Sequence, residues 1–175
     1  MSLFFPTRYR RRVTDVSLAW LREQGIGGLI LDIDNTLTTH DNPDLAPEVT
    51  AWLEQMRAAG MRMMILSNNS PERVAPFAQA VGLAFRPRAK KPLPGAYRAA
   101  AAEMGVDERA CAVIGDQIFT DIVGANLAGM VSVLLEPIEW EKKQKFIVFK
   151  RFWERLLLAI PAQKRRREEE QRNAE

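Results

Sequence analysis

Two carboxylates separated by a single residue are the first sign of chemistry in this sequence. Asp32 and Asp34 stand at the end of the apolar segment GGLILDID. At the end of a buried strand, two such groups repel each other unless a positive charge lies between them. A third carboxylate, Asp116, ends another apolar segment, CAVIGD. Hard oxygen ligands of this kind suit Mg²⁺ and suit zinc or copper poorly, so the sequence predicts a magnesium site.

A lysine and a hydroxyl complete this group of candidate residues. Lys91 supplies a positive charge without being a metal ligand, and Ser67 and the main-chain amides that follow it can donate hydrogen bonds to anionic oxygens. A carboxylate nucleophile could not approach an anionic phosphate without such positive partners. Magnesium, a lysine and a hydroxyl around a carboxylate therefore predict a phosphoryl-transfer site.

The segments that carry these residues alternate between strands and helices. Strands that are apolar throughout predict a parallel sheet covered on both faces. Right-handed crossovers place all carboxyl ends of the strands at one edge, where open sheets bind ligands. We therefore predict a Rossmann-like α/β/α fold of three layers with a five-stranded, mainly parallel sheet. The expected strands are 27–34, 62–67, 83–86, 111–116 and 131–136, and the expected helices are 14–24, 46–59, 71–82, 95–105 and 120–129.

The same residues resemble the motifs of the haloacid dehalogenase (HAD) phosphatases. The segment LDIDNTLT, which contains Asp32 and Asp34, is similar to the DxDxT first motif, and Ser67 is similar to the second. Lys91 in AKKP resembles the third-motif lysine, and GDQIFTD, 115–121, resembles the GDxxxxD fourth motif. The flanks, with FFPTRY and LSNNS, resemble the YqeG-type branch of subfamily IIIA, which is related to phosphatidylglycerophosphate phosphatases. The core match spans about residues 28–136.

The resemblance implies a role for the residues that react. Asp32 would attack phosphorus and form an aspartyl-phosphate. Asp34 would protonate the leaving alkoxide and then take a proton from water. Lys91, favoured over Lys90 because Pro92 follows it, would neutralise the nucleophile and the phosphate. A dehalogenase would lack the second acid, so Asp34 favours hydrolysis of a phosphate ester.

The resemblance also implies the residues that bind phosphate and metal. Ser67 and the main-chain amide of Asn68 would hold phosphate oxygens. Mg²⁺ would be held by Asp32, by the main-chain carbonyl of Asp34 and by Asp116. Asp121 would orient the metal shell or Lys91.

The spacing between the motifs leaves no room for an inserted cap domain. Only 33 positions separate Asp34 from Ser67, and 25 separate Lys91 from Asp116. A helix and a strand use most of each interval. We therefore expect an HAD fold without a large cap, whose open site a phosphate on a macromolecule or at a membrane surface can reach.

The net charge of +3 is unevenly distributed along the chain. Residues 1–25 carry five arginines and two acidic residues, and residues 141–175 carry eleven basic and six acidic residues. The segment KFIVFKRFWERLLLAIP, 145–161, combines helically spaced apolar residues with basic ones. Two arrangements fit this pattern, a helix on an anionic bilayer and a helix packed on the sheet, and both hold together if one stripe packs while the rim faces lipid. We expect residues 1–160 to form one domain, with an N-terminal helix and this C-terminal basic helix, and residues 161–175 to form a charged, flexible tail.

Composition excludes several other classes of protein. No uncharged apolar run approaches the ~20 residues that cross a bilayer, and the single Cys111 excludes an internal disulfide. The basic run 164–167 adjoins three glutamates and lacks stacking aromatic residues, which argues against a nucleic-acid partner. We expect a cytoplasmic protein, with peripheral contact to the inner face of the membrane through the basic termini.

These observations favour a Mg²⁺-dependent phosphomonoester hydrolase. Its favoured substrate is phosphatidylglycerophosphate or a similar lipid or surface-displayed phosphate. Two alternatives stay open at this point. One is a phosphatase of a soluble sugar or nucleotide monophosphate, and the other is a non-catalytic interaction protein with the HAD fold.

Overall fold

A parallel sheet of six strands organises the part of the chain that the structure, a computed structural model, describes: residues 3–39, 42, 44–139, 158–159 and 167–170. The strand order is β1-β6-β5-β2-β3-β4. The strands are β1 (Arg8–Arg10), β2 (Gly28–Leu31), β3 (Arg62–Leu66), β4 (Ala84–Arg86), β5 (Cys111–Gly115) and β6 (Val131–Leu135). The α-helices are α1 (Leu18–Glu23), α2 (Pro47–Ala58), α3 (Pro71–Ala80), α4 (Pro94–Met104) and α5 (Val123–Ala128).

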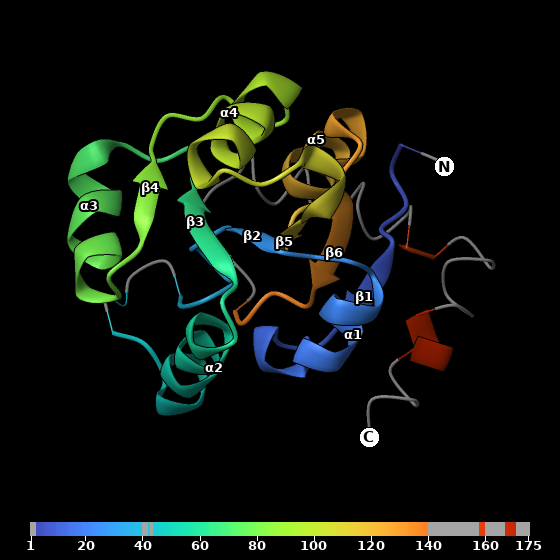
Figure 1. Cartoon of the computed structure of the whole chain (residues 1–175), viewed down its shortest axis with the longest axis horizontal. Helices are drawn as coiled ribbons and strands as arrows, with labels where there is room; N and C mark the ends of the chain where they lie inside the picture. Colours follow the sequence, from blue (N-terminus) through green and yellow to red (C-terminus); the bar gives the residue numbers. More distant parts are fainter. Residues whose placement is uncertain (1–2, 40–41, 43, 140–157, 160–166, 171–175) are drawn as a thin grey trace.

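The helices cover both faces of this sheet, as expected for three layers (Figure 1). Buried side chains of α1, α2 and α3 form one core with alternate residues of the strands, such as Leu29 and Ile65. Buried side chains of α4 and α5 form a second core with the other set, such as Ile30 and Met64. Every residue of β2 and β5 is buried, because both faces of these central strands are covered. The predicted fold class is confirmed.

The sixth strand, β1, was not among the predicted strands. It has only three residues, and the two arginines that flank the buried Tyr9 hide the apolar signal of a strand. β1 pairs with β6, with Tyr9 opposite Leu134, and forms one edge of the sheet. Short, charged strands are common at sheet edges, where they discourage pairing with other chains.

Two helix starts also differ from the prediction. The helix expected over 14–24 from Thr14 begins instead at Leu18, because the hydroxyl of Ser17 caps it by accepting a hydrogen bond from the Trp20 amide at 3.2 Å. Residues Val13–Asp15 form a separate 3₁₀ turn, η1. The segment expected to start a helix at residue 120 begins as a π-helical turn, η3 (Ile118–Ile122), which continues into α5.

The described part of the C-terminal region lies beside the edge strand. The carboxylate of Glu170 accepts a hydrogen bond from the Tyr9 amide at 2.7 Å, and Arg167 forms an ion pair with Glu136. The predicted amphipathic helix over 149–160 falls outside the described residues, apart from 158 and 159. None of the helices in the described ranges is long and apolar enough to cross a membrane.

The connections between strands are short, as the spacing of the motifs indicated. A loop and α2 join β2 to β3, and α4 with a 3₁₀ turn, η2 (Glu108–Ala110), joins β4 to β5. Neither connection contains a further domain, so the carboxyl edge of the sheet has no large cap inserted at these points.

Candidate active site

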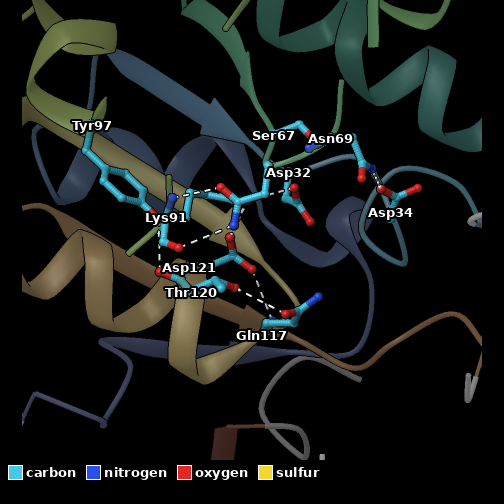
Figure 2. A network of polar contacts seen from close by, with 10 residues as sticks. Asp32, Asp34, Ser67, Asn69, Lys91, Tyr97, Gln117, Thr120 and Asp121 are labelled. Atoms are coloured by element: carbon cyan, nitrogen blue, oxygen red, sulfur yellow. Dashed lines mark hydrogen bonds and ion pairs between the residues drawn. The ribbon is translucent and has the colours of Figure 1, made fainter. Parts of the chain in front are cut away.

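Four neighbouring strands deliver the predicted site residues to one edge of the sheet. Asp32 follows β2, Ser67 follows β3, Lys91 lies in the loop after β4, and Asp116 follows β5. β2 lies between β3 and β5, with Leu31 opposite both Ile65 and Ile114, so residues that follow these strands are neighbours in space. Figure 2 shows Asp32, Ser67 and Lys91 converging beside Asp121.

A buried lysine bridges two carboxylates at the centre of this group. The Lys91 Nζ lies 2.7 Å from Asp32 Oδ1 and 2.7 Å from Asp121 Oδ1. All three side chains are less than 10% exposed, so water screens these interactions little. The amine is therefore held between Asp32, the predicted nucleophile, and Asp121.

Burial and the neighbouring charges shift the pKa of both members of this contact. Burial raises the pKa of Asp32 to about 7; the charges of Asp121 and Asp34 add to the rise, and Lys91 opposes it. Burial alone would lower the pKa of Lys91, but the charges of Asp121 and Asp32 outweigh it, so the pKa lies above its ordinary value. Lys91 therefore stays charged at neutral pH.

The position of Asp121 depends on the π-helical turn η3 and on a glycine beneath it. Asp121 Oδ2 accepts a hydrogen bond from the Gln117 amide at 3.1 Å, while Oδ1 contacts Lys91. A Cβ at Gly115 would lie 2.3 Å from Asp121 Cγ, closer than side chains tolerate. The glycine of the GDxxxxD motif therefore makes space for its last aspartate.

Tyr97, on the preceding helix α4, supports the same π-helical turn. Its ring is fully buried, and its hydroxyl donates a hydrogen bond to the Thr120 carbonyl at 2.9 Å (Figure 2). A Cβ at Gly124 would lie 2.3 Å from the Tyr97 ring. The π turn and the start of α5 are thus fitted closely to the α4 side chain that holds them.

The loop after β3 fixes the main chain of Lys91. Asn68 Oδ1 accepts a hydrogen bond from the Lys91 amide at 2.7 Å, and Asn68 Nδ2 donates to the Lys91 carbonyl at 3.3 Å. Ser67 is buried, and its hydroxyl accepts a hydrogen bond from the Asn69 amide at 3.2 Å. The Asn68 side chain thus has a task that the motif comparison did not assign, which is to hold the loop that carries the lysine.

The second acid, Asp34, lies at the rim of the site and is held by two residues that the sequence reasoning missed. Asn69 Nδ2 lies 2.5 Å from Asp34 Oδ2, and Arg73 Nη2 lies 3.0 Å from Asp34 Oδ1. Asn69 stands next to a predicted site residue in LSNNS, and Arg73 follows it by four positions. Their short distance in the sequence from Ser67 was the only signal available.

The residues present fit a divalent cation. Carboxylate oxygens of Asp32, Asp116 and Asp121 lie within 4.8 Å of one another, and all three residues are buried. Lys91 contributes one positive charge beside these three carboxylates. A buried excess of negative charge is costly unless a cation offsets it, and an all-oxygen donor set suits Mg²⁺. Asp121 in addition accepts hydrogen bonds from Lys91 and from the Gln117 amide.

Three comparisons with known proteins agree with this geometry. The model of the haloacid dehalogenase-like hydrolase family matches residues 6–129. The probable phosphatase YqeG of Bacillus subtilis (strain 168) is 34% identical over 135 residues, which cover 77% of this chain and 78% of YqeG. The solved structure of NagD from E. coli K-12 shares the fold, with a TM-score of 0.55 at 15% identity, over 66% of this chain and 90% of NagD.

The chain belongs to the haloacid dehalogenase-like hydrolases. Within that family it is an enzyme similar to the YqeG phosphatase, as the motifs predicted. It is also 29% identical over 138 residues to phosphatidylglycerophosphate phosphatase 1 of Arabidopsis thaliana, a match that covers 73% of this chain and 39% of that longer protein.

Proposed function

We propose that this protein hydrolyses a phosphomonoester through an aspartyl-phosphate on Asp32, with Mg²⁺ as cofactor. The observation that carries the proposal is the buried Lys91, which contacts both Asp32 and Asp121 at 2.7 Å in a chain of this family. A lysine so placed can neutralise the charge of an arriving phosphate beside the carboxylate that attacks it.

The first half of the reaction forms a bond between Asp32 and phosphorus. The Asp32 carboxylate attacks the phosphoryl group while the bond from phosphorus to the leaving oxygen breaks, and Asp34 gives that oxygen a proton. Ser67 and the Asn68 main-chain amide hold phosphate oxygens. Lys91 offsets the negative charge that Asp32 and the phosphate bring together.

The second half returns the enzyme to its starting state. Asp34, now a carboxylate, takes a proton from a water molecule, which attacks phosphorus and releases inorganic phosphate and free Asp32. Mg²⁺, when bound by Asp32, the Asp34 carbonyl and Asp116, would lower the charge repulsion between the nucleophile and the phosphate. Asp121 keeps Lys91 in position during both halves.

The substrate class that we favour is a lipid phosphate, with phosphatidylglycerophosphate as the leading candidate. Two observations support it: the Arabidopsis relative is named for that substrate, and neither intermotif connection holds a cap that would exclude a bulky, membrane-bound ester. The basic residues near both termini suit an anionic bilayer, each adding about 1 kcal/mol near such a surface. A soluble sugar or nucleotide monophosphate is the second candidate.

A phosphoester panel tests both parts of this proposal. The panel contains phosphatidylglycerophosphate in detergent, sugar phosphates and nucleotide monophosphates, each with Mg²⁺ and with excess EDTA. We expect Mg²⁺-dependent release of phosphate, highest for the lipid, and loss of about 99% or more of it in Asp32→Asn, since catalytic groups contribute about 10²–10⁴-fold. Turnover that survives this substitution would remove Asp32 from the mechanism.

Binding to vesicles tests the membrane contact separately from turnover. Sedimentation with phosphatidylglycerol vesicles should exceed sedimentation with neutral vesicles at low salt. The difference should shrink at high salt, because screening shortens the range of the attraction. Equal, negligible sedimentation with both would favour a soluble substrate.

A further inference from the structure

Both oxygens of the Asp34 carboxylate receive a hydrogen bond from the same short stretch of chain. Asn69 Nδ2 donates to Oδ2 at 2.5 Å, and Arg73 Nη2 donates to Oδ1 at 3.0 Å. The Asp34 side chain is 14% exposed and that of Arg73 is 36% exposed, so the pair lies where the site meets solvent. Figure 2 shows Asn69 and Asp34 facing each other at one side of the Lys91 network.

The two donors are themselves fixed by the loop after β3 and the start of α3. The Asn69 amide donates to Ser67 Oγ at 3.2 Å, and the Asn69 carbonyl accepts from the Arg88 amide at 2.9 Å. Arg73 lies in the first turn of α3, where its amide donates to the Ser70 carbonyl at 3.1 Å. The donors therefore approach Asp34 from a backbone that is already tied to Ser67.

An exposed ion pair alone would mean little, because such pairs contribute about 0–1 kcal/mol. This one differs because its acid is the group that must exchange a proton with the leaving oxygen and then with water. A carboxylate that is held at both oxygens cannot rotate freely, and a small misplacement of a catalytic group can cost about 10²-fold in rate.

We propose that Arg73 and Asn69 are positioning residues. They fix the orientation of the Asp34 carboxyl group for both of its proton transfers. This role rests on the proposed function, because Asp34 needs positioning only if it is the acid that protonates the leaving group. When the bond from phosphorus to the leaving oxygen breaks, the Asp34 proton goes to that oxygen and leaves a carboxylate. Arg73 and Asn69 hold that carboxylate at both oxygens, so that it faces the phosphorylated Asp32 in the same place for the second proton transfer.

Variants of Arg73 test this role without disturbing the core. Arg73 borders a cavity of about 230 Å³, together with Pro76 and Phe77, so Arg73→Met removes the charge and the donors without introducing a clash. Arg73→Lys keeps the charge but not the forked geometry. Arg98→Met is the matched control. Arg98 lies on α4, on the opposite face of the sheet from α3, and forms an exposed ion pair with Glu108 of η2.

The readout is kcat/KM for two substrates that differ in how much their leaving group needs a proton. The 4-nitrophenolate ion leaves without a proton, whereas the alkoxide of glycerol 3-phosphate requires one. We expect Arg73→Met to lower kcat/KM by about tenfold or more for glycerol 3-phosphate and by less than about threefold for 4-nitrophenyl phosphate, a part of the 10²–10⁴-fold of a general acid. Arg73→Lys should recover part of the loss, and Arg98→Met should match the wild type.

A double variant separates positioning from general damage. If Arg73 acts through Asp34, adding Arg73→Met to Asp34→Asn should cost no more than about twofold beyond Asp34→Asn alone. Equal losses on both substrates, or multiplicative losses in the double variant, would overturn the positioning role while leaving the proposed function intact. If the wild-type protein hydrolyses only the lipid of the phosphoester panel, phosphatidylglycerophosphate replaces glycerol 3-phosphate as the ester whose leaving alkoxide needs a proton. A wild-type protein that hydrolyses no member of the panel and neither of these two esters would instead overturn the proposed function, and the positioning role with it.

Discussion

Replacing Asp32 with asparagine should stabilise the metal-free protein at alkaline pH, although it removes the proposed nucleophile. Burial raises the pKa of Asp32 from 3.8 to about 7. The folded protein therefore binds this proton more tightly than the unfolded chain does. The protonated Asp32 therefore contributes to the stability of the folded protein. This contribution is full below about pH 4 and is lost as the pH rises through 7. The amide in the Asp32→Asn variant would resemble the protonated acid and would not titrate.

The size of the effect follows from the pKa. A difference of roughly three pKa units corresponds to about 4 kcal/mol at 1.36 kcal/mol per unit. Relaxation and water entry reduce such penalties in real proteins, so we expect about 2 kcal/mol. At about 2–4 °C per kcal/mol for a chain of this length, the Tm of Asp32→Asn should exceed that of the wild type by about 4–8 °C at pH 8.

Thermal unfolding in EDTA, followed by circular dichroism from pH 5 to pH 8, measures this difference. The gap in Tm should widen with pH and should narrow in 10 mM Mg²⁺, because the ion stabilises the wild-type carboxylate by binding the folded state. Glu54→Gln, an exposed change on α2, should show no such trend. A lower Tm for Asp32→Asn at pH 8 in EDTA, or a gap that does not vary with pH, would refute the reasoning.

Three further substitutions test other parts of the site. Asp116→Ala should raise the Mg²⁺ concentration for half-maximal activity by about tenfold or more, measured by titration of the metal; an unchanged requirement would exclude it as a ligand. Gly115→Ala should lower activity more than about tenfold, because its Cβ would displace Asp121, whereas Gly95→Ala, with open space around it, should keep full activity. Tyr97→Phe should lower the unfolding free energy by about 1–2 kcal/mol in urea melts, because the buried Thr120 carbonyl loses its donor; no change would mean that another donor replaces it.

The strands that carry the chemistry could be predicted because burial on both faces leaves an unbroken apolar run. Each of β2, β3 and β5 ends where a functional residue begins, so apolar pattern and motif reinforced each other. β1 gave no such signal, because an edge strand is short and carries arginines on both sides of Tyr9. A propensity argument cannot detect a strand whose pairing with β6 depends on the rest of the fold.

The candidate site could be predicted at the level of motifs but not of contacts. The structure brings Lys91 to Asp32, as the motif order indicated, yet Arg73 carries no signal of its own in SPERV. Its contact with Asp34 arises because α3 starts beside the loop after β2. The π-helical turn that aims Asp121 was equally hidden, because a turn of five residues at the start of a helix is too short to show a period of its own.

The shared hold on Lys91 has a consequence for turnover as a cycle. Of its two anionic partners, only Asp32 changes its covalent state in the proposed reaction, while Asp121 stays a carboxylate throughout. The Lys91 amine therefore keeps its contact with Asp121 while Asp32 is phosphorylated and then released. Because this charge need not move between the two steps, neither phosphorylation nor hydrolysis requires Lys91 to reorganise. The same cation can thus serve attack on the ester and attack by water from one fixed position.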